Sequence, residues 1–295
     1  FTIPQFFSRR FRDDKNILAV LAAVIIIIFF IPYTASGFAA CGKLFSSLFG
    51  MNYMTAMIIS AVVIVAYTTA GGFFAASATD FVQSIIMTVA IVFVLVFSTI
   101  SAGGIDVVVE NAKALPGYLS LTASYIEDTG KSEPYNLLHI ITTLSWGLGY
   151  FGMPHILLRF MAIEDEKKLK LSRRVASVWV VIAMAMAVLI GIVGRALSNT
   201  GLVDQLHGND TETIIVRVAH LLSTYGAFPA IMAGLILAGI LASTMSTADS
   251  QLLAAASSVS ENILREAFHL KISEKKSMLA ARLTVIGIAI LGIII

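Results

Sequence analysis

The segment Leu144-Ser-Trp-Gly-Leu-Gly-Tyr-Phe-Gly-Met-Pro154 interrupts an otherwise apolar stretch that covers residues 136–158. Proline removes a backbone donor and clashes with the preceding turn, and glycine leaves the backbone exposed, so a helix should break or kink here. Open backbone at membrane depth is tolerated only where protein or a water-filled cavity satisfies it. Glycines that merely let helices approach closely are the alternative, but they leave Pro154, Trp146 and Tyr150 unexplained. We therefore interpret the segment as a broken membrane helix that carries a binding site.

The composition around this segment indicates a membrane protein. Of the 295 residues, 58% are hydrophobic and 13% are charged, whereas a soluble domain carries about 25% charged residues. Each apolar stretch reaches the roughly 20 residues that a spanning helix needs. A large buried helical core would need amphipathic partner helices, which the sequence lacks. We predict an all-α polytopic membrane protein with about seven spans, at 16–45, 54–76, 80–102, 136–158, 175–197, 227–257 and 277–295.

Several other classes of protein lack support in the sequence. The single cysteine, Cys41, excludes an intramolecular disulfide framework, and the five histidines show no metal-ligand spacing. No pairing of nucleophile and base and no phosphate loop is present, so an enzyme is not expected. Nucleic acid is not an expected partner. The first residue is not Met and the last span stops while still apolar, so we expect a single transmembrane domain over 1–295 that is truncated at both ends.

Charge predicts the orientation. Walking through seven spans assigns fifteen of the 20 Lys and Arg residues to one side, which the positive-inside rule places in the cytoplasm. This alternation puts the N-terminal end there, in a plasma (inner) membrane, and the loops at about 103–135 and 198–226 outside, as caps built of short amphipathic pieces. The mixed-charge run 164–174 is interpreted as a solvated loop, with contact to anionic lipid as the alternative. The cytoplasmic group contains Arg9, Arg10, Arg12, Lys15, Arg159, Lys167, Lys168, Lys170, Arg173, Arg174, Arg265, Lys271, Lys275, Lys276 and Arg282.

A polar stripe lies within the sixth predicted span. Ser243, Ser246, Thr247 and Ser250 fall at i, i+3, i+4 and i+7 and so share one helix face. Hard cations take oxygen ligands, and hydroxyls with a carbonyl can supply several without formal charge, which suits a monovalent ion. The alternative is that these hydroxyls bond back to carbonyls of their own helix, as is common for Ser and Thr. The motif alone leaves both open.

Two acids and a tyrosine add weaker signals. Acids in apolar spans are costly and point to function, which makes Asp80 and Asp249 candidates for an ion path. Asp80 follows Thr79 near an expected helix start, where N-capping would explain it as well. Asp249 could line an exit path or meet a basic loop. Tyr33, which follows Pro32 in the first span, is a candidate for the same cavity, although isolated tyrosines in membrane helices often only pack.

Taken together, these motifs resemble the sodium:solute symporter family, and within it the bacterial sodium/proline symporters. The likeness covers nearly the whole chain. The resemblance implies a leucine-transporter-type five-plus-five inverted-repeat fold with substrate near the midplane, of which these spans would be core helices three to nine. The segments that carry it are IPYTASGFAACGKLF (31–45), TAGGFFAASATDFVQ (69–83), WGLGYFGMPHILLRFMA (146–162) and MSTADSQLLAAASS (245–258).

The resemblance also implies roles for single residues. Trp146, Tyr150 and Pro154 match positions implicated in proline binding, and Tyr33 matches a tyrosine at the same cavity. Ser246 and Thr247 match hydroxyl ligands of sodium, and Ser243 falls where the family typically has an alanine that contributes its carbonyl. Asp80 matches an acid along the cytoplasmic route of the ion.

The expected function is therefore secondary active transport, a sodium-coupled symport of a small amino acid, most specifically L-proline, by alternating access. Sodium, proline and the lipid bilayer are the expected partners. Two departures bear on the solute, because Met153 stands where proline carriers commonly have Gln, and Ser243-Thr244 stands where they have smaller apolar residues. Sodium symport of another solute such as pantothenate is one alternative. A transporter-like input domain of a membrane sensor is the other.

Overall fold

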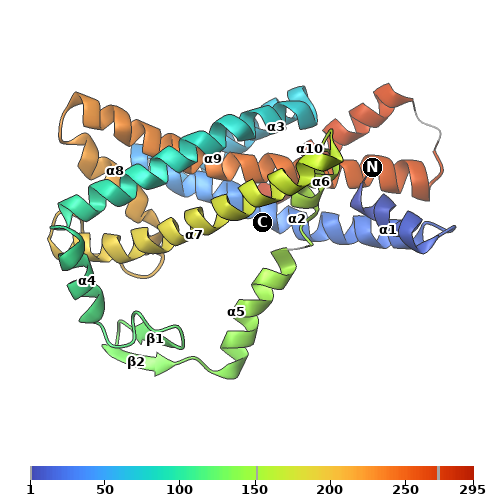
Figure 1. The fold of residues 1–295 in the computed structure, drawn as a ribbon. Helices are drawn as coiled ribbons and strands as arrows, with labels where there is room; N and C mark the ends of the chain where they lie inside the picture. Colours follow the sequence, from blue (N-terminus) through green and yellow to red (C-terminus); the bar gives the residue numbers. More distant parts are fainter. Residues whose placement is uncertain (1, 151, 271–272) are drawn as a thin grey trace. The chain divides into compact units, whose positions relative to one another are not determined.

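A computed structural model of the chain describes residues 2–150, 152–270 and 273–295. Phe151, within the broken segment, and Lys271, one of the basic residues assigned to the cytoplasm, lie outside the described residues. The elements run along the chain as α1 (Ile3–Phe11), α2 (Ile17–Phe49), α3 (Tyr53–Ser101), α4 (Ile105–Lys113), β1 (Ala123–Ile126), β2 (Lys131–Pro134), α5 (Leu137–Tyr150), α6 (Pro154–Met161), η1 (Glu166–Lys168), α7 (Leu169–Asn199), η2 (Gly208–Thr213), α8 (Ile214–Ser223), α9 (Ala227–Ser257), η3 (Ser258–Ala267) and α10 (Glu274–Ile294) (Figure 1).

Within the described part of the chain, five helical stretches are long and apolar enough to cross a membrane. They are α2, α3, α7 with η1, α9 with η3, and α10. Their large apolar side chains are widely exposed, for example Phe74 at 85% and Ile100 at 72%. A water-soluble fold would not leave such long apolar faces open. The protein is a multi-pass helical membrane protein.

The five helices differ from the seven predicted spans at two places. The predicted spans 54–76 and 80–102 join in α3, a helix of 49 residues whose one non-helical residue is Gly72. The predicted boundary at 77–79 is therefore wrong. The helix is interrupted at Gly72, which follows Gly71, and it is continuous again through Thr79. The predicted span 136–158 is split into α5, with 14 residues, and α6, with 8.

Two further details depart from the predictions. Helix α7 begins at Leu169, so the second half of the predicted loop 164–174 is helical. The loop at 103–135, predicted to contain short amphipathic pieces, contains the short helix α4 and also an antiparallel hairpin in which Ala123 pairs with Pro134 and Ile126 with Lys131. An all-helical prediction lacks this hairpin. Its strands are four residues each, too short for a clear alternating pattern.

By its contacts the chain divides into two units. Unit 1 comprises the described residues of 1–87, 154–173 and 240–295, and unit 2 comprises the described residues of 88–153 and 174–239.

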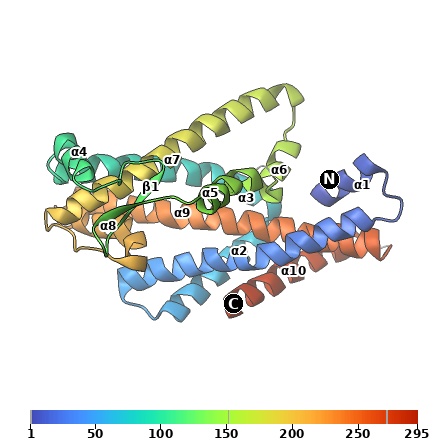
Figure 2. The ribbon, with the colours of Figure 1, turned by 90° about the horizontal axis from the view of Figure 1, so that it is seen from below.

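Unit 1 has a core between α2, α3, α9 and α10. Phe38, Leu252, Ile64 and Ile288 are at most 4% exposed within it. Figure 2 shows α10 running beside α2. Because the packing faces are made of apolar and small side chains, the helices approach closely, as is typical in membranes.

The end of α9 in unit 1 continues as a π-helical segment, η3. π-Helical turns are rare and occur most often at functional sites. Helix α1 is joined to η3 by side-chain hydrogen bonds, from Thr2 Oγ1 to Asn262 Oδ1 at 3.0 Å and from Gln5 Nε2 to Glu266 Oε1 at 2.9 Å. Asn262 is fully buried. This polar contact fixes the short N-terminal helix against the end of the long one.

Unit 2 has its own apolar core. Val94 of α3, Leu197 of α7, Val218 of α8 and Ile236 of α9 are at most 1% exposed in it. Trp179 donates a hydrogen bond from Nε1 to Thr88 Oγ1 at 2.9 Å, which ties α7 to α3. The short amphipathic pieces predicted in the two long loops include the helices α4 and α8.

Candidate functional site

The predicted break lies where the sequence places it. Helix α5 ends at Tyr150 and α6 begins at Pro154, and between them Gly152 N donates to Gly149 O at 3.1 Å. Proline suits the first position of α6, because its missing N–H would have no helical partner there. Gly147 and Gly149 stay within α5. Pro154 therefore marks the break between the two helices, whereas Gly147 and Gly149 are accommodated within α5.

The two aromatic residues of α5 form a pair in unit 2. Trp146 and Tyr150 are one turn apart, and their ring centroids lie 5.7 Å apart at an interplanar angle of 42°. They are 66% and 43% exposed. Two flat, open rings on one helix face offer an apolar surface with a hydroxyl at its edge.

The other two predicted substrate residues, Tyr33 and Pro154, belong to unit 1. His155, which follows Pro154, packs edge-on against two rings of α2, with its centroid 6.2 Å from that of Tyr33 and 5.6 Å from that of Phe30. The structure thus brings Tyr33 beside the start of α6. The hydroxyl of Ser36 donates to the Tyr33 carbonyl at 2.7 Å.

The polar stripe on α9 gathers the three predicted sodium ligands. Ser246 Oγ and Thr247 Oγ1 each lie 3.1 Å from the carbonyl oxygen of Ser243 and donate to it. The hydroxyls therefore bond back within their helix, which is the alternative that the sequence leaves open. The same three oxygens are neutral and lie together on one face, so their chemistry also fits a monovalent cation.

The two predicted acids belong to one hydrogen-bonded network in unit 1. Asp80 pairs with Arg159 of α6, whose Nη2 also donates to the Ser250 hydroxyl. Ser250 Oγ lies 3.0 Å from Asp249 Oδ1, and the Tyr67 hydroxyl donates to Asp249 Oδ2 at 2.8 Å. Asp249 is fully buried.

This network corrects the N-capping alternative for Asp80. Thr79 lies inside α3 and its hydroxyl bonds back to the carbonyls of Ala75 and Ala76, each at 2.9 Å. Asp80 is consequently an interior helix residue, and its partner is a guanidinium 79 positions away in sequence. Asp249 does not meet a basic loop directly, because Tyr67 and Ser250 provide its hydrogen bonds.

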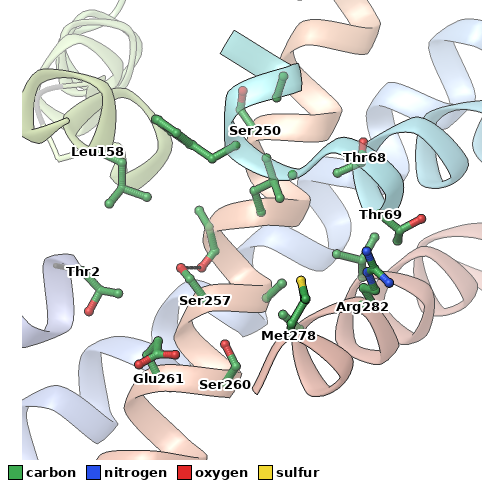
Figure 3. A pocket seen from close by; sticks show the side chains of 18 of the residues that line it. Thr2, Thr68, Thr69, Leu158, Ser250, Ser257, Ser260, Glu261, Met278 and Arg282 are labelled. Carbon is green, nitrogen blue, oxygen red and sulfur yellow. Dashed lines mark hydrogen bonds between the residues drawn. The ribbon is translucent and has the colours of Figure 1, made fainter. Parts of the chain in front are cut away.

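A cavity of about 710 Å³ opens beside this network in unit 1. Ser250, Ser257 and Ser260 line it from α9 and η3, Thr68 and Thr69 from α3, and Met278 and Arg282 from α10 (Figure 3). The cations of its wall, which are Arg159, Arg265 and Arg282, all belong to the basic group that the sequence assigns to the cytoplasm. The polar face of α9 thus continues past Ser250 along the cavity.

Three residues of this region escape prediction from the sequence. Tyr67, His155 and Arg159 stand singly in apolar runs, and the only signal they give is a polar group at membrane depth. Charge alternation groups Arg159 with the loop cations, although it lies within α6. The partners that give these residues a role come from other helices.

The comparisons with known proteins agree with the motifs. Residues 1–295 match the sodium:solute symporter family. The osmoregulated proline transporter OpuE of Bacillus subtilis is 38% identical over 294 residues, which cover 100% of this chain and 56% of that protein. The sodium/proline symporter 2 of Staphylococcus saprophyticus is 37% identical over 99% of this chain and 54% of its own length. The high-affinity proline transporter PutP of Bacillus subtilis is 36% identical over 100% of this chain and 59% of its own length.

A solved structure has a similar fold. A Na⁺-coupled sialic acid symporter in a substrate-bound outward-open state superposes with a TM-score of 0.78 at 19% identity, over 99% of this chain and 60% of that one. The chain spans about half the length of the curated relatives that it matches. Because the family match extends over all of its residues, this chain belongs to the sodium:solute symporter family.

Proposed function

We propose that this protein is a secondary active transporter that couples the uptake of L-proline to the entry of Na⁺. The observation that carries the proposal is the 36–38% identity, over the whole chain, to proteins named as proline transporters and sodium/proline symporters. The family match adds sodium as the co-transported ion. Neither the sequence identities nor the family match depends on the arrangement of single side chains.

The proposed architecture is finer than the five long helices. Helix α3 would exceed the bilayer by far at about 1.5 Å per residue, but Gly72 divides it into two parts that are each long enough to span. Counting these two parts, and α5 with α6 as one broken span, gives seven. We propose that they are core helices three to nine of a five-plus-five inverted-repeat bundle in the plasma membrane, with the N-terminal end of the chain in the cytoplasm.

The proposed sodium site uses the oxygens of Ser243, Ser246 and Thr247. An arriving ion would take the Ser243 carbonyl and the two hydroxyls that now bond to it, which exchanges weak internal hydrogen bonds for coordination. No formal charge is needed for a monovalent ion. Asp80 and Asp249, farther along the same network, are proposed to lie on the route by which the ion leaves.

For the solute, Trp146 and Tyr150 are the proposed contacts, with Pro154 and Tyr33 retained from the family resemblance. Transport then needs no covalent chemistry. If sodium and proline both favour the same state of the protein, each raises the affinity of the other by the same factor. Alternating access coupled in this way drives proline uptake with the sodium gradient.

The solute is tested by uptake of radiolabelled L-proline into vesicles that contain the full-length protein, in the presence of excess unlabelled compounds. Unlabelled proline should abolish the signal, and pantothenate or other small amino acids should leave most of it. Stronger competition by one of those compounds would assign the site to another solute. Met153, which stands where proline carriers commonly have Gln, makes the choice of solute the point to test.

A further inference from the structure

Arg159 has an unusual position for a cation. It belongs to α6, its side chain is 36% exposed, and one nitrogen, Nη2, donates both of its hydrogens, to the Asp80 carboxylate of α3 and to the Ser250 hydroxyl of α9. A single guanidinium thus joins three helices of unit 1. Arginine stays charged, and its planar guanidinium differs in geometry and hydration from a lysine ammonium.

The charges around Arg159 do not balance. Two carboxylates, Asp80 and Asp249, share this one guanidinium within the network, and Asp249 reaches it only through Ser250. In the described part of the chain, Asp80 Oδ1 is buried and has no hydrogen-bond partner. Buried acids without full compensation are costly. The network therefore has the electrostatic capacity for one more positive charge.

The network also touches the proposed sodium site. Ser250 Oγ lies 2.8 Å from the carbonyl of Ser246, one helical turn from the hydroxyls of Ser246 and Thr247. Arg159 and Ser250 line the cavity of about 710 Å³. An ion that left the stripe toward this cavity would pass Asp249 and Asp80, and Asp80 is paired with the guanidinium of Arg159.

We propose that Arg159 is a tethered cation that competes with Na⁺ for the Asp80 carboxylate and thereby promotes release of the ion into the cavity. The inference deepens the proposed function and rests on it. Two cations at one carboxylate repel each other, so the ion and the guanidinium bind there in alternation. When Arg159 returns to Asp80 and Ser250, the ion loses the Asp80 carboxylate as a partner. Arg159 is a positioning residue in this scheme and does not hold the solute.

The competition can be measured from the side of the cavity. Proteoliposomes that contain the full-length protein take up labelled proline at saturating external Na⁺, while the internal Na⁺ concentration is varied. The half-inhibiting internal concentration should fall about tenfold in Arg159→Gln, within the roughly 5- to 150-fold range usual for coupled sites. Arg159→Lys should shift it less, because the charge is kept. Arg173→Gln, at an exposed cation of the same charge, is the matched control.

Two acid variants complete the test. Asp80→Asn keeps the shape of the carboxylate and should raise the half-inhibiting concentration. Adding Arg159→Gln to Asp80→Asn should change that concentration little, because the carboxylate for which the two cations compete is then absent. Equal inhibition curves for Arg159→Gln and Arg173→Gln would overturn the proposal. If Arg159→Gln fails to fold, an unchanged curve for Asp80→Asn overturns it instead.

Failure of the proposed function gives a different result. In that case the unmodified protein itself takes up no proline with sodium. The thermal unfolding midpoint can then be compared between NaCl and KCl. This measurement needs no solute and still reports whether Arg159 competes with Na⁺. A sodium-specific stabilisation that saturates at lower concentration in Arg159→Gln would support the competition, and identical curves would contradict it.

Discussion

Asp249 is a carboxylate with no exposed surface, and it is the one charged residue of helix α9. Two hydroxyls, of Tyr67 and Ser250, provide its hydrogen bonds. Leaving a buried charged group short of a partner costs more than an ordinary hydrogen bond gains. The tyrosine, which comes from the neighbouring helix α3, therefore matters for stability as well as for the position of the acid.

Tyr67→Phe tests this dependence. The variant keeps the ring and removes the donor, so it should destabilise the protein by about 1–3 kcal/mol, the cost of an unsatisfied buried group. The measurement is the thermal unfolding midpoint of the purified protein in detergent. Tyr53→Phe, at a tyrosine that is 40% exposed, is the control and should have little effect. Equal shifts in the two variants would contradict the role of the hydroxyl.

For single residues, the sequence predicts which side chains share a helix face, but it misses contacts between side chains of different helices. Ser246 and Thr247 lie together with the Ser243 carbonyl because a helical period places them so. Asp80 invites a local explanation, N-capping beside Thr79, because its true partner, Arg159, is distant in sequence. No spacing rule connects an acid on α3 with a cation on α6.

The course of helix α3 depends on one residue, Gly72. Gly72 has φ 59° and ψ −154°, a conformation that is essentially restricted to glycine. The two helical parts on either side of it can then turn relative to each other without breaking the chain. A side chain at this position conflicts with the backbone itself, whatever space surrounds it.

Gly72→Ala should therefore destabilise the protein by about 1–3 kcal/mol, the usual cost of such strain. Gly191→Ala is the matched control, because Gly191 is helical and a Cβ there meets no atom within 4 Å. That control should be neutral or stabilising, since alanine favours a helix over glycine. Unfolding midpoints that move in the same direction for both variants would show that the break at Gly72 is not required.

The elements also show what pattern reasoning can and cannot predict. The break before α6 is predictable because Pro154 and its neighbouring glycines have a direct backbone effect. The same reasoning, applied to Gly71-Gly72, finds the break in α3, whereas a boundary placed at residues 77–79 misses it. The strands of the hairpin are too short for a clear pattern, and the π-helical end of α9 meets a partner, Thr2 with Asn262, that is distant in sequence.

For the whole molecule, the charge distribution predicts a topology. Lys167 lies in the basic stretch assigned to the cytoplasm, and Thr129 lies in the turn of the hairpin assigned to the outside; both are exposed. Cys41 is the one cysteine of these 295 residues, so a background in which it and every cysteine of the full-length protein outside them are replaced by alanine is free of thiols. Single cysteines can then report the side of each loop.

A membrane-impermeant maleimide applied to intact cells should label Thr129→Cys and should leave Lys167→Cys unlabelled. Permeabilised cells should show labelling of both, which controls for the presence and reactivity of each thiol. The reason is that loops rich in Lys and Arg remain in the cytoplasm. Labelling of Lys167→Cys in intact cells, with Thr129→Cys protected, would reverse the orientation and move the cavity beside Arg159 to the outer face.

The most direct test of sodium-coupled proline transport is labelled proline uptake by the full-length protein, with and without an inward sodium gradient, repeated in Thr247→Ala. Thr244→Ala is the control, because Thr244 lies on the same helix and also bonds back, to Ile240 O at 3.2 Å, but lies outside the polar stripe. We predict uptake that requires the gradient, collapses in Thr247→Ala and persists in Thr244→Ala. Proline uptake that is indifferent to sodium and to Thr247 would contradict the coupling.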